Sequence, residues 1–301
     1  MTVTGPISSE LLGRTLMHEH LFCDLTRDTW ANNNLLNDPE LTFLELQRYK
    51  DVGGQTLVDQ TNRGLGQNPL AVKAMAERTG LNIILGCGWY REPYYEPYLA
   101  RWKTDQVAEQ MIRDVTEGID GTGVRAGIIG EIGAHATWIS AVEERMLRAA
   151  GRAQKKTGVT LTLHATRAPL GLDQLDILKE EGVDLRRVVV GHMHSYPYHE
   201  YHAEVARRGA FVTFDRMGVT NAFEQQRIIR LIRQMIEAGY VNHLMLSQDV
   251  CFRSDLVAYG GVGYGYVHGD LLPLLREAGV TDEQLHQILM VNPRRALTGE
   301  D

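Results

Sequence analysis

Short runs of apolar residues recur along the whole chain, and a longer amphipathic or polar segment separates each run from the next. The runs have the length of β-strands and are apolar at consecutive positions, which is typical of parallel strands covered on both faces. We therefore predict a parallel sheet under helices. The predicted strands are residues 15–20, 55–59, 82–88, 124–131, 159–164, 187–192, 210–215 and 244–249.

The segments between these runs carry signals for the ends of helices. Asp38 followed by Pro39 is typical of an N-cap and a first helical position, and Gly80 is typical of a helix end. Ser140 and Glu143 have the spacing of a capping box. The predicted helices are residues 39–50, 69–79, 105–118, 140–156, 172–181, 200–208, 222–238, 271–278 and 282–290.

Eight strand–helix units in a chain of 301 residues favour a (β/α)8 barrel over an open, doubly wound sheet. A doubly wound dinucleotide-binding sheet would place a GxGxxG turn after the first strand, and the chain lacks that motif there. Barrels of this size are commonly one domain, so residues 1–301 are predicted to form a single α/β domain.

Composition narrows the classes of partner. The net charge is -7 and no stripe of Lys and Arg with interleaved aromatic residues occurs, which argues against nucleic-acid binding. No run of about 18 apolar residues predicts a membrane span, and the first residues lack a signal-peptide pattern. The widely spaced Cys23, Cys87 and Cys251 indicate reduced thiols and a cytoplasmic location.

Candidate chemistry is concentrated at the carboxyl ends of the predicted strands. These ends meet at one mouth of a barrel, where barrel enzymes have their active sites. Imidazoles and carboxylates gathered there suit divalent metal ions, and six of them with one bridging carboxylate suffice for two ions. The alternative is a set of separate polar strand ends that face solvent. The candidate ligands are His18, His20, Glu131, His164, His192 and Asp249.

The order of these residues (His-x-His on the first strand, an acid on the fourth, histidines on the fifth and sixth, Asp on the eighth) resembles the amidohydrolase superfamily. More closely, the chain resembles the phosphotriesterase-related family. The matching stretches run through nearly the whole chain. They are residues 17–21 (MHEHL), 130–133 (GEIG), 162–164 (TLH), 190–192 (VGH), 246–249 (LSQD), 259–264 (YGGVGY) and 291–295 (VNPRR).

This resemblance implies a binuclear metal centre. His18, His20 and Asp249 would hold the more buried ion, and His164 and His192 would hold the more exposed one. Zinc suits these histidine and carboxylate ligands, and manganese, cobalt and iron also suit them.

The bridging position separates the branches of the family. The founding phosphotriesterases have a carboxylated lysine there, whereas this chain resembles the branch in which a glutamate, here Glu131, provides the carboxylate without uptake of CO2. The resemblance further implies that a metal-bridging hydroxide attacks the C=O or P=O group of the substrate. Asp249 would be the catalytic residue that takes the proton of this hydroxide.

Two departures from the founding phosphotriesterases bear on the substrate. Where their proton relay continues through an Asp and a His, this chain has Ser195 and Arg216. Lactonase relatives carry Arg after the seventh-strand Asp, as in Asp215-Arg216, which favours a lactone or another carboxylic ester as substrate. The alternatives are a phosphotriester or an N-acyl amide cleaved by the same site and, less favoured, a non-catalytic barrel with structural metal.

Several aromatic and basic residues near the predicted mouth are candidates for contact with a small-molecule substrate. Each has a plain alternative: packing or an oligomer contact for the aromatic residues, and a salt bridge or a surface position for the arginines. The Gly-rich loop after the eighth strand is a candidate lid. The resemblance also suggests a homodimer. The candidate substrate contacts are Trp89, Tyr90, Arg216, Arg253 and Tyr264.

Overall fold

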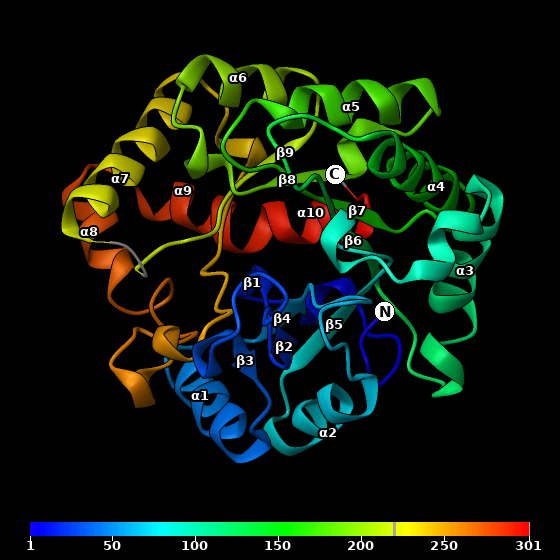
Figure 1. The fold of residues 1–301 in the computed structure, drawn as a ribbon. Helices are drawn as coiled ribbons and strands as arrows, with labels where there is room; N and C mark the ends of the chain where they lie inside the picture. The colour runs from blue at the N-terminus through cyan, green and yellow to red at the C-terminus, as the bar shows by residue number, and fades with distance from the viewer. Residues whose placement is uncertain (219–220, 301) are drawn as a thin grey trace.

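The computed structural model of the protein describes residues 1–218 and 221–300. Eight parallel strands form one sheet, and Figure 1 shows this sheet curled into a nearly closed barrel with helices around its outside. Strands that follow one another along the chain are neighbours in the sheet. The barrel strands are β1 (Thr15–Glu19), β4 (Thr56–Asp59), β5 (Asn82–Cys87), β6 (Ile128–Gly133), β7 (Thr160–His164), β8 (Val188–Gly191), β9 (Phe211–Phe214) and β10 (Leu244–Leu246).

A helix follows every barrel strand, which confirms the predicted (β/α)8 architecture. In Figure 1, the helices from α1 in blue to α7 in yellow surround the strands. A short antiparallel pair, β2 (Cys23–Asp24) with β3 (Leu35–Leu36), lies between β1 and the first helix. The helices are α1 (Pro39–Asp51), α2 (Pro69–Thr79), α3 (Thr104–Thr116), α4 (Ala141–Thr157), α5 (Leu170–Glu180), α6 (His199–Arg207), α7 (Ala222–Glu237), α8 (Leu271–Glu277), α9 (Asp282–His286) and α10 (Asn292–Thr298).

Most predicted strands match the observed ones to within one residue at each end, but two differ by more because tertiary contacts determine their ends. The run predicted at 124–131 forms β6 four residues later, since the backbone of Ala126 donates to Asp114 at the end of α3 instead of joining the sheet. The run predicted at 244–249 is a strand only to Leu246. Ser247 and the residues after it form hydrogen bonds with β1 through both side-chain and backbone atoms.

The predicted helix 282–290 is α9 followed by one π-helical turn, and α10 continues from it. The sequence analysis did not predict α10, in which Pro293 lies in the first turn, a position where a helix accepts proline. Among the described residues, no helix combines the length and the apolar character that crossing a bilayer requires.

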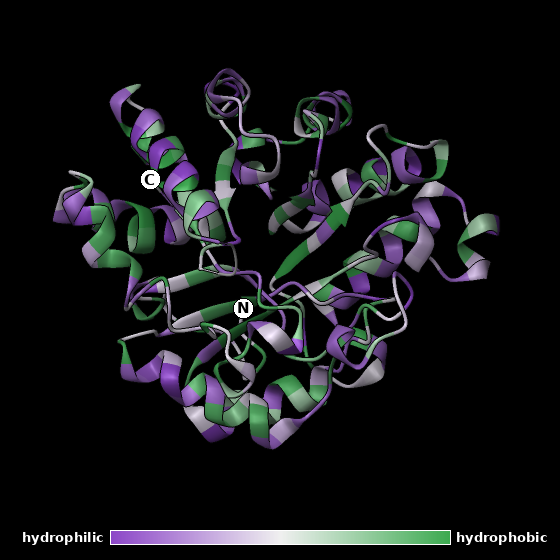
Figure 2. Ribbon diagram, turned by 60° about the vertical axis from the view of Figure 1, so that its left-hand side comes forward, coloured by the Kyte–Doolittle hydropathy of each residue, from purple (hydrophilic) through white to green (hydrophobic). Residues whose placement is uncertain are grey.

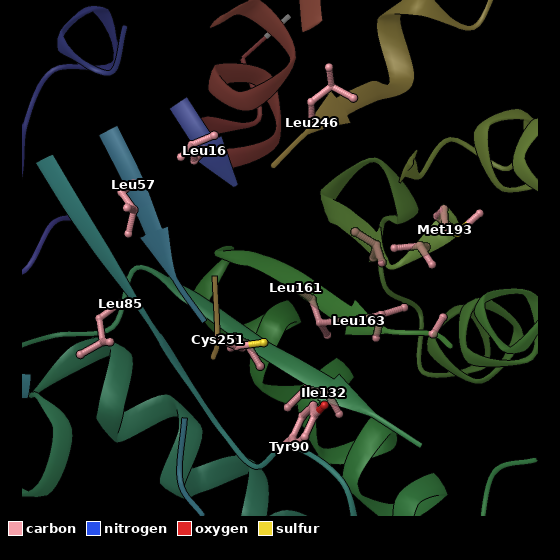
Figure 3. Packing of buried hydrophobic residues seen from close by; sticks show 14 of the residues in the cluster. Leu16, Leu57, Leu85, Tyr90, Ile132, Leu161, Leu163, Met193, Leu246 and Cys251 are labelled. Carbon is pink, nitrogen blue, oxygen red and sulfur yellow. The ribbon is translucent and has the colours of Figure 1, made fainter. Parts of the chain in front are cut away.

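Apolar side chains form two clusters that meet at the strands. The outer cluster packs the strands against the helices, and Figure 3 shows Leu16, Leu57 and Leu85 of this cluster on β1, β4 and β5. In Figure 2 the strands are mainly green, whereas the helices alternate green and purple, as helices with one buried face do. The inner cluster lies inside the barrel and consists of Leu12, Met17, Val58, Ile84, Ile128, Val189, Phe211, Met245 and Ala296.

Candidate metal centre

The structure brings all six predicted metal ligands together at the carboxyl ends of the barrel strands. Glu131 lies within β6, His164 is the last residue of β7, and His192 follows β8 directly. The side chains come from the ends of five strands, β1, β6, β7, β8 and β10, which the barrel topology brings to one mouth. All six are buried: His18, His20, Glu131, His164, His192 and Asp249.

One group of donors, which we call the buried ligand set, consists of His18, His20 and Asp249. The Oδ1 atom of Asp249 lies 3.3 Å from Nε2 of His20 and 3.7 Å from Nε2 of His18. The same two nitrogens lie 3.7 Å and 3.5 Å from the carboxylate oxygens of Glu131. All four side chains therefore face one common point.

The second group, which we call the outer ligand set, consists of His164 and His192. Nδ1 of His164 lies 3.0 Å from Oε2 of Glu131, and Nε2 of His192 lies 3.3 Å from the same oxygen. Glu131 thus contacts both sets, which is the placement expected of a bridging carboxylate.

The spacing of these atoms fits divalent metal. Ligand atoms at 2.0–2.2 Å from a tetrahedral zinc ion lie roughly 3.3–3.6 Å from one another. The donor separations given above span 3.0–3.7 Å. The Nε2 atom of His18 is also buried without a hydrogen-bond partner among the described residues, as a ligand atom awaiting an ion would be.

The pKa values of the clustered side chains also support a metal site. Burial alone would raise the pKa of Glu131, but His18 and His164 hold it well below its usual value. Burial opposes protonation of His192, and Asp215 nevertheless raises its pKa to about 10. Burial and the neighbouring His192 lower the pKa of His164 to about 4. Without ions the buried carboxylates hold protons on nearby imidazoles, and divalent cations would displace those protons.

Polar groups outside the two sets orient the histidine rings. The carboxylate of Asp215 accepts a hydrogen bond from Nδ1 of His192 at 2.9 Å and lies 3.3 Å from Nδ1 of His18. Nδ1 of His20 pairs with the hydroxyl of Thr61 at 2.9 Å. Because the Nδ1 atoms of His18, His20 and His192 are engaged, their Nε2 atoms face the centre, whereas His164 faces Glu131 with Nδ1. Outer partners of this kind hold a metal-binding imidazole in position.

Two ligands have backbone torsions that are unusual for residues with a side chain. The φ angle is +57° at His192 and +48° at Asp249. A left-handed conformation costs roughly 1–2 kcal/mol at such a residue, so other contacts must hold it. Glu19 provides contacts of this kind for Asp249. Burial raises the pKa of Glu19 to about 7, and hydrogen bonds from Val250, Ser247 and Gln248 oppose that rise.

A cavity of about 250 Å³ opens above the cluster and is lined by residues from most of the loops that follow the strands. Tyr90 and Arg216, two of the predicted substrate contacts, line it. The hydroxyl of Tyr90 lies 3.4 Å from Nε2 of His164. Arg216 donates to the backbone oxygen of Asp249 at 2.6 Å and to Asp255 at 3.2 Å.

The other three predicted substrate contacts do not line this cavity. Trp89 is fully buried and its indole N–H donates to Glu96 at 2.8 Å, so it packs the loop after β5. Arg253 donates to the backbone of Leu35 and to Asn37. Sequence patterns identify aromatic and basic residues near a mouth but cannot tell packing residues from lining residues.

Tyr264 is also buried, and its hydroxyl donates to the backbone oxygen of His20 at 2.6 Å. The glycine-rich loop that was predicted as a lid is therefore anchored beneath the ligands at this residue. The cavity wall also includes Asp28, His194, Cys251 and Phe252, which the sequence analysis did not identify as substrate contacts.

The fold and the site define the class of protein: a (β/α)8 barrel with a buried histidine and carboxylate cluster at the carboxyl ends of its strands. Sequence comparison then specifies the family. The profile of the phosphotriesterase family matches residues 1–297. The chain belongs to the phosphotriesterase family, and its relatives indicate a hydrolase.

Three relatives illustrate the range of the family. A phosphotriesterase homology protein of Mycobacterium tuberculosis is 36% identical, with 98% of this chain and 96% of that protein covered. An N-acetyltaurine hydrolase of Xenopus tropicalis is 30% identical, with 99% and 97% covered. The crystal structure of a lactonase from Listeria monocytogenes has a TM-score of 0.94 at 27% identity, with 100% and 99% covered.

Proposed function

We propose that this protein is a hydrolase that depends on two divalent metal ions and cleaves a lactone or another carboxylic ester. The observation that carries the proposal is the position of Glu131. Its buried carboxylate lies within 3.7 Å of nitrogen atoms from four histidines. Zinc suits this donor set, and manganese, cobalt and iron also suit it.

The chain would hold one ion with the buried ligand set and the other with the outer ligand set, while Glu131 contacts both. Bound there, the ions would supply Lewis-acid activation of the scissile carbonyl group and of the attacking water. The protein itself provides the orientation of the ligands through Asp215 and Thr61, and it excludes bulk water because every ligand is buried.

Asp249 is the residue that we propose accepts the proton of the attacking water. Its Oδ1 atom faces His18 and His20, and its Oδ2 atom lies 3.7 Å from Nη1 of Arg216. Burial opposes ionisation of Asp249, but the hydrogen bond from His20 and the charge of His18 lower its pKa. The carboxylate is therefore ionised at neutral pH, as a proton acceptor must be.

Arg216 and Tyr90 are proposed to orient the substrate. Only Nη1 of Arg216 has partners among the described residues, so its other N–H groups are available to a carboxylate or sulfonate on the substrate. The hydroxyl of Tyr90 is placed beside His164, where it can donate to a substrate oxygen. A cavity of about 250 Å³ restricts the substrate to a small molecule.

An N-acyl amide is the second candidate substrate. Arg216 on the cavity wall suits an acyl amide that carries an anionic group, and one relative at 30% identity is an N-acetyltaurine hydrolase. The same donor set serves ester and amide cleavage, because both reactions add water to a carbonyl carbon.

Metal analysis and a substrate panel test the proposal. The purified protein is stripped with a chelator, reconstituted with zinc, and tested on lactones, aryl esters, N-acyl amino acids and phosphotriesters. We expect two equivalents of metal per chain and the highest kcat/KM on a lactone or ester. Highest turnover on N-acyl amides would support the second candidate. Protein that binds no metal, or that turns over phosphotriesters alone, would contradict both.

A further inference from the structure

The barrel has a seam between its first and last strands. β1 and β10 are the two edges of the sheet, and no strand pairing joins them among the described residues. Bonds at the ends of these strands close the seam instead. The backbone N–H of His18 donates to Oγ of Ser247 at 2.9 Å, and the N–H of Asp249 donates to the backbone oxygen of His18 at 3.0 Å.

The side chain of Glu19 makes further connections across this seam. Its Oε1 atom accepts hydrogen bonds from the Ser247 hydroxyl and from the Gln248 N–H, both at 2.7 Å. Its Oε2 atom accepts from the Val250 N–H at 3.0 Å. The residue is fully buried, so water does not compete for these donors.

The left-handed backbone of Asp249 explains why one carboxylate reaches both flanking amides. A left-handed residue within a turn makes successive N–H groups converge into a concave site for an anion. Here the anion is the carboxylate of Glu19, and the amides are those of Gln248 and Val250. The side chain of Asp249 is directed to the opposite side, toward His18 and His20.

We propose that Glu19 is a positioning residue, which holds Asp249 at the correct separation from His18 and His20 across the seam. The inference rests on the proposed function, since it concerns the ion held by the buried ligand set. Glu19 is not itself a ligand, because both of its oxygens are occupied by donors of the loop after β10. It acts on that ion only through Asp249.

The variant Glu19→Gln tests this role. The amide keeps the size of the side chain, but its NH2 group must face either the Val250 N–H or the Gln248 N–H, and two donors then oppose each other. Glu45→Gln is the matched control. Glu45 is equally buried and accepts hydrogen bonds from the amides of Val257 and Ala258 further along the same loop, away from the ligands.

The readouts are metal affinity by chelator competition, hydrogen exchange of the peptide containing residues 247–250, and steady-state kinetics. For Glu19→Gln we expect about 10- to 100-fold weaker binding of one of the two equivalents and faster exchange in that peptide. We also expect a fall in kcat that excess metal reverses, with little change in KM. Glu45→Gln should bind both equivalents like the wild type.

The outcomes separate the two proposals. Wild-type protein that binds two equivalents, together with Glu19→Gln protein that binds both as tightly and keeps its kcat, would overturn the role of Glu19 alone. Equal losses of affinity in Glu19→Gln and Glu45→Gln would also overturn it, since the effect would then be a general loss of stability. Wild-type protein that binds no metal would overturn the proposed function.

Discussion

Asp249 has two tasks in the proposed site, because one oxygen faces the buried ligand set and the other faces the cavity. The variant Asp249→Asn keeps the size of the side chain but removes its ability to take a proton. We expect kcat to fall by about 10²- to 10⁴-fold, with the fold retained by circular dichroism. Asp184→Asn, at a partly exposed carboxylate outside the cavity, is the control. Full turnover with both metals bound would show that Asp249 is not the proton acceptor.

Arg216 and Arg253 offer a paired test of substrate binding, since only the first lines the cavity. For Arg216→Gln we expect KM to rise about 10- to 100-fold on substrates with a carboxylate or sulfonate, because a hydrogen bond to a charged group contributes about 1.5–3 kcal/mol. A neutral ester of the same acyl group should be affected much less. Arg253→Gln should leave KM unchanged for both substrates. Equal changes of KM in the two variants would contradict the proposal that Arg216 binds the substrate.

The sequence predicted the metal-ligand candidates better than the cavity wall, and the reason is physical. Residues at i and i+2 at a strand end share a side, so His18 and His20 could be placed together from spacing alone. The wall depends on which way each loop folds. Trp89 and Tyr264 turn inward to pack, and Arg216 is held by Asp255, which lies 39 residues away in the chain. No local pattern encodes such contacts.

At the level of strands, the close approach of β6 and β7 positions His164. A Cβ atom built on Gly133 would lie 2.6 Å from Cβ of His164, closer than such atoms can be. Gly133→Ala should therefore displace the imidazole, weaken metal binding by about tenfold or more, and lower the free energy of unfolding by about 1–3 kcal/mol. Gly265→Ala is the control, because its nearest neighbour is 3.5 Å away. Chelator competition and urea unfolding provide the measurements; unchanged affinity would contradict the expectation.

Some helix ends could be predicted closely from the sequence, because local residues determine them. α2 begins at Pro69 and ends before Gly80, as the sequence indicates, and Gly80 has the left-handed torsion of a helix cap. Strand ends depend instead on distant partners. β10 stops at Leu246 because Ser247 and the residues after it bond to β1, which is more than two hundred residues away in the chain.

At the scale of the whole molecule, we expect acid stability to depend partly on His268, which is not one of the predicted ligands. His268 is buried, neither ring nitrogen has a hydrogen-bond partner among the described residues, and its ring lies 5.4 Å from that of Tyr49. Burial and the charge of Arg14 lower the pKa of His268 to about 3. The unfolded chain therefore binds more protons than the folded one below the ordinary histidine pKa of about 6.5, and stability is lost as the pH falls.

The variant His268→Phe keeps an aromatic ring and removes this titration. Between pH 7.5 and 5.5, wild-type protein should lose about 1.4 kcal/mol more unfolding free energy than the variant, because one pH unit below 6.5 corresponds to about 1.36 kcal/mol. Urea unfolding at the two pH values, at the same metal content, measures the difference. If wild type and variant lose the same free energy, the histidine does not contribute to acid sensitivity.

The apolar inner cluster fills the lower half of the barrel, and Leu12 and Ala296 close it beneath the strands. Among the described residues this packing separates the cavity from the opposite end of the barrel, so we expect the cavity to have one opening. Substrate must arrive, and both fragments must leave, by the same opening. In the proposed site, a fragment that remains at the ligands blocks the next substrate molecule, so we expect inhibition by product to be competitive. For such an enzyme, release of the fragments sets an upper limit on the rate, however fast the bond is cleaved.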